Sequence, residues 1–404
     1  MTGSAGRSFL PAVVCASLLA LACGPREAAF EIAVTRVGRR TVVCSLLGVN
    51  VAAVATRAGL VVVDSHRSPA TMAAIKRRIE AETTRRDYLA VVNTHGDWDH
   101  CSGNQIFPDS LRKGHRNAPV YMRSRPADAP SIIWPLRSTV ARWRAGDPDD
   151  GDDRSLPAWA AVLSSLETGY RPAPPTRVFD DSLTIDGGDL TIELAWAGNA
   201  HTDNDVLAYL PQERLLFTGD LFTSAGSLGF QVNPLADVPR LLRVLDGFLA
   251  RGIDHAVPGH GAVMTGADVR SLRSLLAERY ATFDGKRSAA QCLEQAITTA
   301  DAGRALKRYD ALPSQFYRSQ EELSILGRRL QGQGRSAEAA AVFWAGLGEY
   351  PGSALLRHDL AGLHLALGQR DSARQYYRLV LQAVPGNRDA EAMLEGLDGK
   401  EGIE

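Results

Sequence analysis

The sequence predicts an α+β domain followed by an all-α domain built from helical repeats. Up to about residue 268, short runs rich in β-branched and aliphatic residues alternate with helical patterns, and four of these runs end in turns that carry His or Asp. Beyond that point the strand pattern disappears, and the tail repeats itself with an offset of 34 residues. A chain of 404 residues is long enough for two or three domains.

The composition is that of an ordinary folded protein, and it disfavours some classes of partner. The chain has 45 Lys and Arg residues against 46 Asp and Glu residues, for a formal net charge of -1. Because proteins that bind nucleic acid usually carry a basic excess, we expect no nucleic acid partner. The sequence also has no basic cluster, which favours neutral or small acyl substrates over polyanions.

Residues 1–23 have the pattern of an export signal. Arg7 precedes an apolar stretch, Phe9 to Ala22, whose 14 residues are too few to span a bilayer. The stretch ends in Leu-Ala-Leu-Ala-Cys-Gly, which resembles a bacterial lipoprotein cleavage site, although Ala20 stands where Leu, Val or Ile is usual. We therefore expect a signal peptide and a periplasmic or outer-membrane lipoprotein anchored to the membrane through Cys23, with plain secretion as the alternative.

Three cysteines, Cys44, Cys101 and Cys292, remain in the body of the chain. An odd number excludes a complete set of disulfides, and the three residues lie far apart in different motifs. We expect Cys44 and Cys292 to be free buried thiols. We expect Cys101 to be a small buried residue beside the predicted site rather than a ligand.

The segments before the first polar turn have strand and helix patterns. Residues 41–64 predict two or three antiparallel strands, and residues 68–86 predict a helix with Pro69 near its start. A five-residue apolar strand then ends in the loop THGDWDHCSGN. The stretch 108–176 predicts a long, partly helical insertion, whose three tryptophans either pack its interior or line a substrate pocket.

The residues of greatest chemical interest are the His and Asp residues at the four strand ends. They are His95, Asp97, Asp99, His100, His201, Asp220 and His260. Imidazole and carboxylate groups are donors that first-row metal ions accept, and six or seven of them suit two ions that share a bridging group. Each residue alone is more often structural, but seven of them in four comparable turns favour a metal site.

The segments THGDWDH, AHTDND, FTGDLF and PGHG, in this order, resemble the metallo-β-lactamase superfamily, whose members are metal-dependent enzymes with an αββα sandwich fold. The resemblance implies a metal-binding domain over residues 30–280. By position it implies these ligands: His95, Asp97 and His201 for a first metal, Asp99, His100 and His260 for a second, and Asp220 between them. Asp64, at the end of an earlier strand, would orient a ligand histidine.

One of these ligands departs from the usual pattern of the superfamily, because H-G-D-W-D-H stands here in place of H-x-H-x-D-H. The Asp97 carboxylate, in place of a neutral imidazole, lowers the charge of the site and shifts its preference toward iron or manganese without excluding zinc. A carboxylate at this position also occurs in the di-iron flavoprotein branch of the superfamily. A non-haem di-iron oxidoreductase is therefore one alternative, and a site that holds a single metal is another.

The C-terminal tail resembles the tetratricopeptide repeat, a helix-turn-helix unit. Aromatic and Pro residues recur at the 34-residue offset, as in the pairs Phe343 and Tyr377, and Pro351 and Pro385. The resemblance implies helical repeats over residues 315–395 that bind a protein partner, self-associate or act as a stabilising cap. Because two repeats seldom bury a core alone, we expect them to lean on an earlier helix such as the one at 271–281.

The expected function is that of an exported metal-dependent hydrolase. A metal-activated hydroxide, oriented by Asp99, would attack an ester, lactone, β-lactam or related small substrate at a site with two Zn²⁺ ions. The sequence does not identify the substrate, because one fold supports many chemistries. A binding or assembly protein that acts through the repeats is a further alternative. It predicts that alanine at both His95 and His260 leaves the cellular phenotype intact.

Overall fold

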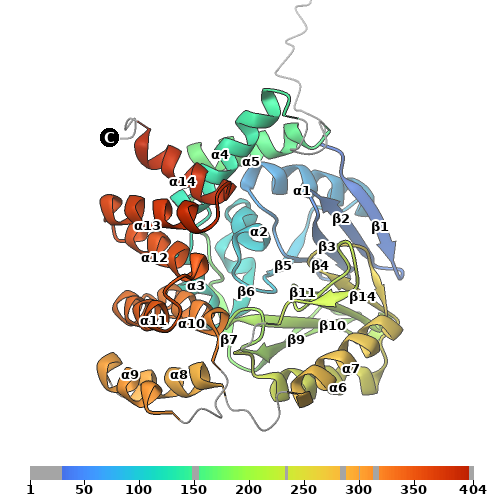
Figure 1. The fold of residues 1–404 in the computed structure, drawn as a ribbon. Helices are drawn as coiled ribbons and strands as arrows, with labels where there is room; N and C mark the ends of the chain where they lie inside the picture. The colour runs from blue at the N-terminus through green and yellow to red at the C-terminus, as the bar shows by residue number, and fades with distance from the viewer. Residues whose placement is uncertain are drawn as a thin grey trace, which may run out of the picture.

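The structure is a computed structural model that describes residues 30–147, 154–232, 235–282, 288–299, 301–312 and 318–399. The predicted signal peptide and Cys23 lie outside the described residues. The described chain forms a sandwich of two β-sheets with helices on both outer faces, and a stack of helices lies along one side of it (Figure 1). This arrangement confirms the predicted α+β fold with αββα layers and a helical tail.

The first sheet comes from the N-terminal part of the chain. Its strands, in spatial order, are β1 (Ala33–Val37), β2 (Thr41–Leu46), β3 (Val49–Thr56), β4 (Gly59–Val63), β5 (Tyr88–Val92), β6 (Arg112–His115) and β7 (Arg177–Phe179). The strands from β1 to β4 are antiparallel, so residues 41–64 form three antiparallel strands, as predicted. From β4 to β7 the neighbours are parallel.

The second sheet comes from the following segment. Its spatial order is β15 (Met264–Thr265), β14 (His255–Pro258), β11 (Leu215–Gly219), β10 (Asp205–Leu210), β9 (Thr191–Gly198) and β8 (Ser182–Asp186), and a separate hairpin contains β12 (Phe222–Thr223) and β13 (Gly229–Phe230). The pair β11 and β14 is parallel. Parallel pairs in both sheets therefore end at one edge of the sandwich, and this edge carries the polar turns.

The helices of the described chain are α1 (Pro69–Thr83), α2 (Trp98–Cys101), α3 (Ala118–Ser124), α4 (Pro130–Arg144), α5 (Leu156–Thr168), α6 (Val238–Arg251), α7 (Gly266–Thr282), α8 (Ala289–Thr299), α9 (Ala302–Asp310), α10 (Gln320–Gly332), α11 (Ser336–Glu349), α12 (Ala354–Ala366), α13 (Arg370–Ala383) and α14 (Arg388–Asp398). Short 3-10 helices are η1 (Ser102–Ile106), η2 (Asp109–Leu111) and η3 (Pro211–Glu213). Within the described ranges, no helix is both long and apolar enough to cross a membrane.

Side-chain alternation along the strands places apolar residues on both faces of each sheet. Val61 and Val92 of the first sheet pack against Leu194 and Phe217 of the second, and together they belong to the core between the sheets. On the outer face of the first sheet, α1 contributes Ile75 and its apolar neighbours to a second core. Full burial of each such side chain stabilises the fold by roughly 1.5–3 kcal/mol, so these cores hold the strand ends in register.

The predicted helix at 68–86 is observed as α1, and its ends have local causes. Ser68 caps the first turn by accepting a hydrogen bond from the backbone N–H of Thr71, and Pro69 occupies the first turn, where its missing N–H has no cost. The helix ends at Thr84, whose backbone is left-handed. The outer face of the second sheet is covered in the same way by α6 and α7.

The stretch 108–176 contributes a strand as well as helices. Its strand β6 pairs with β5 and β7 in the first sheet, so part of the predicted insertion belongs to the sandwich. Its helices α4 and α5 pack on each other, with Trp134 and Trp159 against their shared core. These two tryptophans therefore pack the inserted helices.

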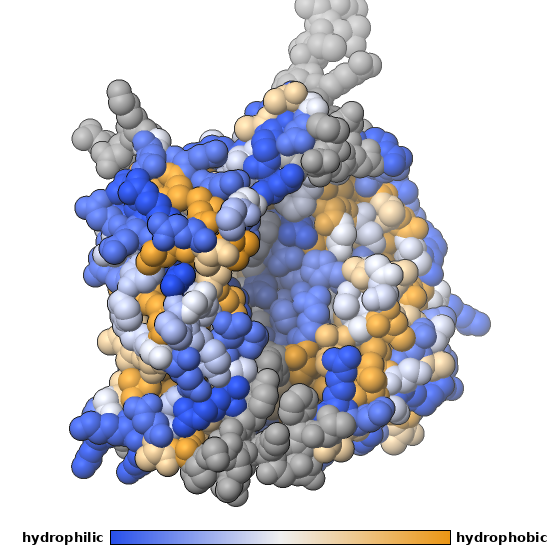
Figure 2. Space-filling view, in the orientation of Figure 1, coloured by the Kyte–Doolittle hydropathy of each residue, from blue (hydrophilic) through white to orange (hydrophobic). Residues whose placement is uncertain are grey.

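The repeat helices dock on these inserted helices. Trp134 of α4 packs into the core of α13 and α14, and α10 contacts α3. The tail therefore leans on earlier helices, as predicted, but the example named, the helix at 271–281, is not the one with these contacts. That helix, α7, packs its apolar residues into the core beneath the second sheet. Because they dock on the inserted helices, the repeats lie beside the polar edge of the sandwich, and a hollow separates the repeats from this edge (Figures 1 and 2).

Candidate metal centre

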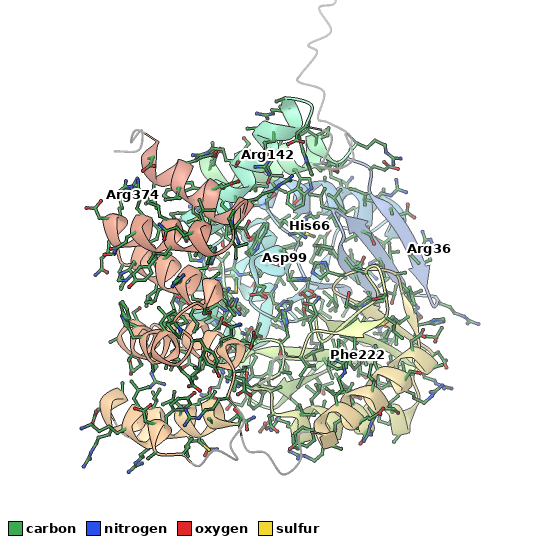
Figure 3. All side chains as sticks on the ribbon, viewed as in Figure 1. Arg36, His66, Asp99, Arg142, Phe222 and Arg374 are labelled. Carbon is green, nitrogen blue, oxygen red and sulfur yellow. The ribbon has the colours of Figure 1, made fainter. Side chains whose placement is uncertain are left out.

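The seven His and Asp residues predicted from the sequence come together at the polar edge of the sandwich. The turn after β5 contributes His95 and Asp97, and the short helix α2 that follows contributes Asp99 and His100. The turns after β9, β11 and β14 contribute His201, Asp220 and His260. Figure 3 shows Asp99 near the middle of the molecule, between the sheets and the repeat helices. Residues distant in sequence thus form one cluster.

A first group of donors surrounds His95. The ligand atoms of His95, His201 and Asp220 lie within 4.8 Å of one another. The Oδ2 atom of Asp97 lies 3.2 Å from Nε2 of His201 and 3.6 Å from Nε2 of His95. Asp97 therefore lies beside the two imidazoles of this group.

A second group of donors lies next to the first. It contains Asp99, His100 and His260, whose ligand atoms also lie within 4.8 Å of one another. The Nε2 atom of His260 is 3.3 Å from Oδ2 of Asp99 and 3.2 Å from Nε2 of His100. Asp220 connects the two groups, because its Oδ1 is 3.3 Å from His100 Nε2 while its Oδ2 is 3.8 Å from His95 Nε2.

All four imidazoles are oriented by an oxygen atom at Nδ1. The partners are Thr94 Oγ1 for His95 at 3.0 Å, Asp64 Oδ2 for His100 at 3.2 Å, the Gln231 carbonyl for His201 at 3.0 Å and the Gly48 carbonyl for His260 at 2.9 Å. Such partners fix the ring orientation and, through it, the nitrogen offered to a metal. Each Nε2 consequently faces the cluster, and Asp64 has the orienting position predicted for it.

Two buried atoms of the cluster lack a hydrogen-bond partner among the described residues. They are Nε2 of His95 and Oδ1 of Asp220, on side chains that are 1% and 6% exposed. A buried polar group without a partner is rare, and it often marks the place of a missing ion or water. Both atoms are good donors for a divalent metal, so the residues present fit such an ion.

Burial and the opposite charges within the cluster act in opposite directions on the pKa values of its carboxyl and imidazole groups. Burial favours the neutral form of Asp97 and Asp220, but hydrogen bonds from the surrounding imidazoles hold the pKa of both carboxyls well below its usual range. Burial lowers the pKa of His201 and His260, yet hydrogen bonds to the carboxylates raise it to about 9 in each. Burial also lowers the pKa of His100, but the charges of Asp220 and Asp99 raise it well above its usual value.

Comparison with known protein families decides the identity of this fold and site. A sequence model of the metallo-beta-lactamase superfamily matches residues 45–268, more than half of the chain. The chain belongs to the metallo-beta-lactamase superfamily. Its members generally are hydrolytic enzymes that typically bind metal ions, and the present cluster lies where the matched motifs end their strands. A tetratricopeptide repeat model matches residues 330–397, and such repeats commonly mediate protein interactions.

Solved structures include similar arrangements at low sequence identity. A metallo-beta-lactamase from Pontibacter korlensis is 17% identical, with a TM-score of 0.42 and a match that covers 61% of this chain and 99% of that protein. The stereoselective inverting sec-alkylsulfatase Pisa1 from Pseudomonas sp. is 15% identical, with a TM-score of 0.48 and coverage of 91% of this chain and 62% of that protein. A search of curated proteins found no match.

The inserted helices add residues to the superfamily site that the motifs did not reveal. Tyr121 of α3 donates a 2.7 Å hydrogen bond to Oδ1 of Asp97, and Arg125 donates a 2.6 Å hydrogen bond to the Tyr121 hydroxyl. Burial and the Asp97 carboxylate raise the pKa of Tyr121 well above its usual value, so the hydroxyl remains a donor. The sequence carries no signal for this contact, because α3 lies outside the strand-end motifs.

Two further supporting residues were missed. Asp205 accepts hydrogen bonds from the backbone N–H groups of His201 and Thr202, at 2.7 Å and 2.9 Å, and so shapes the turn that carries His201. It is the last residue of the AHTDND segment, so this motif could have revealed it. The second residue is Arg67, whose Nη1 lies 3.5 Å from Oδ2 of Asp99. The guanidinium group of Arg67 lies over the rings of Trp98 and Trp159.

Residues set aside from the sequence have structural positions. Cys101 is 2% exposed, and its thiol contacts backbone carbonyls, as expected of a small buried residue. Cys44 is a buried free thiol, as predicted. Cys292 is free but only partly buried, so the prediction that it is buried is wrong. Of the nine histidines in the sequence, the five outside the cluster are His66, His115, His255, His358 and His364. His66 is buried and bonded to the Leu46 carbonyl at 2.8 Å, which satisfies it without a metal.

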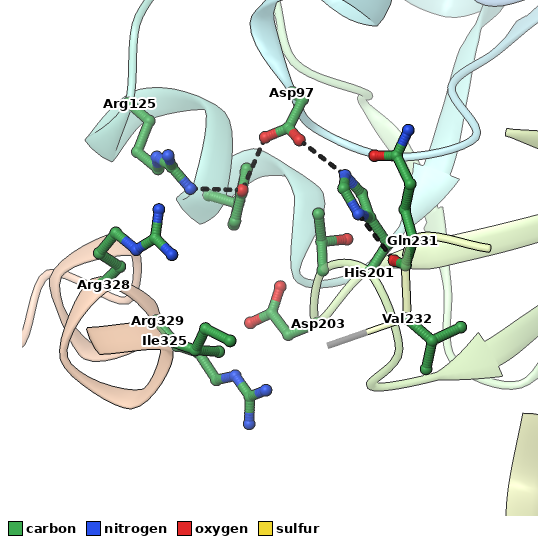
Figure 4. Close-up of a pocket in the computed structure, with 11 residues that line it drawn as sticks. Asp97, Arg125, His201, Asp203, Gln231, Val232, Ile325, Arg328 and Arg329 are labelled. Atoms are coloured by element: carbon green, nitrogen blue, oxygen red, sulfur yellow. Dashed lines mark hydrogen bonds and ion pairs between the residues drawn. The ribbon is translucent and has the colours of Figure 1, made fainter. Parts of the chain in front are cut away.

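A cavity of about 320 Å³ opens beside the first group of donors (Figure 4). The residues that line it are Asp97, Tyr121, Arg125, His201, Thr202, Asp203, Gln231, Val232, Ile325, Arg328 and Arg329. The last three belong to α10, the first helix of the tail that contacts α3. The cavity therefore has the metal-binding edge on one side and a repeat helix on the other.

Proposed function

We propose that the protein is a metal-dependent hydrolase with two metal ions, acting on an ester, lactone, β-lactam or related small substrate. The residues that would hold the ions are His95, Asp97 and His201 for the first, Asp99, His100 and His260 for the second, and Asp220 for both. Zinc fits the imidazoles, and the added carboxylate also admits iron or manganese.

The observation that carries this proposal is that two buried donor atoms of the cluster, Nε2 of His95 and Oδ1 of Asp220, have no hydrogen bond among the described residues. An unsatisfied buried polar atom costs about 1–3 kcal/mol. Cations between the two donor groups would satisfy both atoms. They would also replace the protons that now separate the carboxylates from the imidazoles.

Bound metal ions would lower the pKa of a water molecule and offset the negative charge that develops on the substrate. The chain itself would supply the group that receives the water's proton. We expect Asp99, whose Oδ2 lies 3.3 Å from Nε2 of His260 within the cluster, to accept this proton and to pass it to the leaving group. Arg67, 3.5 Å away, favours the anionic form of Asp99 and limits its movement.

The test is to purify the full chain, expressed for export, without added metal or chelator and to measure its metals by mass spectrometry. Acyl and phosphoryl ester hydrolysis is then assayed before and after metal removal. We expect close to two metal equivalents and metal-dependent hydrolysis, both lost in His201→Ala. His255→Ala is the matched control, because His255 is an exposed histidine at the start of β14. A protein that cannot be loaded with metal would overturn the proposal.

A di-iron oxidoreductase is a second candidate, favoured by the Asp97 carboxylate beside His201. It predicts iron as the dominant metal, a visible charge-transfer band and oxygen uptake with a separate electron donor. Asp97→His, which restores the imidazole usual in the superfamily, would then reduce iron binding relative to zinc. Zinc in the isolated protein together with hydrolysis would exclude this candidate.

We also propose that the mature protein is a lipoprotein anchored through Cys23 and that the repeats contact a protein partner or a second copy. The support for the anchor is the Leu-Ala-Leu-Ala-Cys-Gly pattern. In detergent phase partition the wild-type protein should enter the detergent phase, and Cys23→Ser should move to the aqueous phase. Equal partition of the two proteins would refute the anchor.

A further inference from the structure

Two arginines from different parts of the chain meet at the cavity beside the first donor group. Arg125 directly follows the last residue of α3, Arg328 lies in α10, and Figure 4 shows their guanidinium groups pointing toward each other. Both side chains are exposed to solvent, and the side chain of Arg328 is 44% exposed. Exposed guanidinium groups that face each other inside a cavity are unusual, because like charges repel.

Acidic groups around this pair offset part of its positive charge. Arg329, the third arginine of the cavity, is buried and its Nη1 forms a 2.6 Å ion pair with Glu294. Asp359 lies 3.8 Å from Nε of Arg328 and also accepts a hydrogen bond from Ser324. Asp203 lines the cavity as well, and its Oδ1 accepts a 2.9 Å hydrogen bond from Asn204.

The pair also lies close to the proposed reaction centre. Arg125 donates to the hydroxyl of Tyr121 at 2.6 Å, and this hydroxyl donates to Asp97 at 2.7 Å, so two hydrogen bonds separate the guanidinium from a proposed ligand. One N–H donor of Arg125 serves Tyr121, which leaves others that can turn toward the cavity. An anion held there would be next to the proposed metal ions.

We propose that Arg125 and Arg328 together bind an oxyanion group of the substrate, so that the enzyme acts on small anionic substrates carrying a sulfate, phosphate or carboxylate. Guanidinium groups offer paired N–H donors that match the oxygens of such anions, and an anion between them removes their repulsion. The inference rests on the proposed hydrolase function and narrows its substrate class. It replaces the expectation of neutral substrates, because the basic residues cluster only after folding.

The proposal makes the first repeat helix part of the substrate site. Gly332 at the end of α10 accepts a hydrogen bond from Ser124 of α3, which ties the two arginine-bearing helices together. The tail would then act in recognition of the substrate, whatever else the repeats bind.

The test is calorimetric binding of inorganic sulfate, inorganic phosphate and acetate to the full, metal-loaded chain, with the metal content measured again afterwards. For at least one of the three anions we expect Arg328→Gln to weaken binding about 10- to 100-fold, the loss of a charge-assisted contact, and Arg328→Lys to weaken it less. Arg308→Gln, at an exposed arginine of α9 outside the cavity lining, should bind like the wild type. The anion whose binding is weakened by Arg328→Gln identifies the charged group that the substrate carries.

Unchanged binding of all three anions by Arg328→Gln and by the double variant Arg125→Gln, Arg328→Gln would overturn the inference. Thermal unfolding of the variants checks that they are folded. Failure of the hydrolase proposal is distinguishable, because it would appear as absent metal or absent turnover, and anion binding is measured without turnover. If the enzyme hydrolyses esters but the KM for anionic and neutral nitrophenyl esters is equally insensitive to Arg328→Gln, only this inference fails.

Discussion

The hydroxyl of Tyr121 donates a 2.7 Å hydrogen bond to Oδ1 of Asp97, while Oδ2 of the same carboxylate lies 3.2 Å from Nε2 of His201. The two carboxylate oxygens of Asp97 thus have different partners. One is held by the inserted helix α3, and the other faces the imidazoles of the first donor group. The inserted helix therefore supports the one ligand that departs from the superfamily pattern.

We expect Tyr121→Phe to weaken the first metal about 10- to 100-fold, as loss of a hydrogen bond to a ligand commonly does, and to leave the second unchanged. Metal competition with a chromophoric chelator measures both affinities. Tyr88→Phe is the control, because it removes a tyrosine hydrogen bond to Glu80, at 2.9 Å, far from the cluster. Equal affinities in Tyr121→Phe and wild type would show that the hydrogen bond has no supporting role.

Metal binding should release protons at neutral pH. The pKa of His201 and of His260 is raised from 6.5 to about 9 in the metal-free site, so both imidazoles are protonated at pH 7.5 and must lose a proton to bind a metal. The apparent metal affinity should therefore increase with pH up to about 9. Calorimetry in two buffers of different ionisation enthalpy counts the protons, and a count of zero at pH 7.5 would contradict this ionisation.

The same shifts predict how the stability of the metal-free protein depends on pH. A raised pKa means that the folded protein holds these protons more tightly than the unfolded chain does. The resulting contribution to the free energy of unfolding is therefore complete below pH 6.5 and is lost as the pH rises through about 9. We expect the Tm of the metal-free protein to fall over this interval by more than that of the metal-loaded protein. Parallel Tm profiles for the two forms would refute the assignment.

Gly259→Ala should damage the metal centre. A Cβ atom at this position would lie 2.1 Å from Oδ1 of Asp220 and 2.8 Å from Cε1 of His100, closer than atoms can approach. We expect loss of metal and a destabilisation of about 1–3 kcal/mol from the forced displacement. Mass spectrometry and thermal unfolding measure these effects.

Gly247→Ala is the matched control for that substitution. Gly247 lies inside α6, and no atom lies within 4 Å of an added Cβ. Because Ala favours a helix more than Gly, this variant should be more stable by about 0.5–1 kcal/mol and should retain its metal. Full metal content in Gly259→Ala would show that the close approach at the cluster is not required.

Gly396→Ala should loosen the docking of the tail on the inserted helices. An added Cβ would lie 2.1 Å from Cδ2 of Trp134, and the bulky indole is packed into the core of α13 and α14. We expect a lower Tm, with a destabilisation of about 1–3 kcal/mol, and faster proteolysis of the last helices. Gly348→Ala in α11, where an added Cβ meets no atom within 4 Å, should be neutral or stabilising. Identical proteolysis of both variants would argue against this docking.

Much of the candidate site could be predicted because its residues follow short apolar strands. His95, Asp97, Asp99 and His100 lie within six consecutive positions, so their proximity needs little information beyond the local sequence. The αββα fold was implied by the resemblance of these motifs to the metallo-β-lactamase superfamily, and the repeats were implied by the resemblance that their period carries. Asp205, inside a recognised motif, could also have been found from the sequence.

The remaining features depend on contacts between distant segments. Neither the position of Tyr121 beside Asp97 nor the meeting of Arg125 with Arg328 has a signal in spacing or composition. That the tail leans on earlier helices was predicted, but the sequence did not indicate that these helices are α3 and α4. Periodicity shows that a helix has an apolar face, but it does not show which surface will cover that face.

The sequence by itself determined the donor residues, their order along the chain and the two kinds of domain, because these features depend on local spacing and strand or helix patterns. Only the tertiary structure decided which groups orient the donors and which charges surround the cavity. Packing of α10 on α3 places Arg328 near Arg125, and that packing is set by complementary surfaces of segments far apart in the chain.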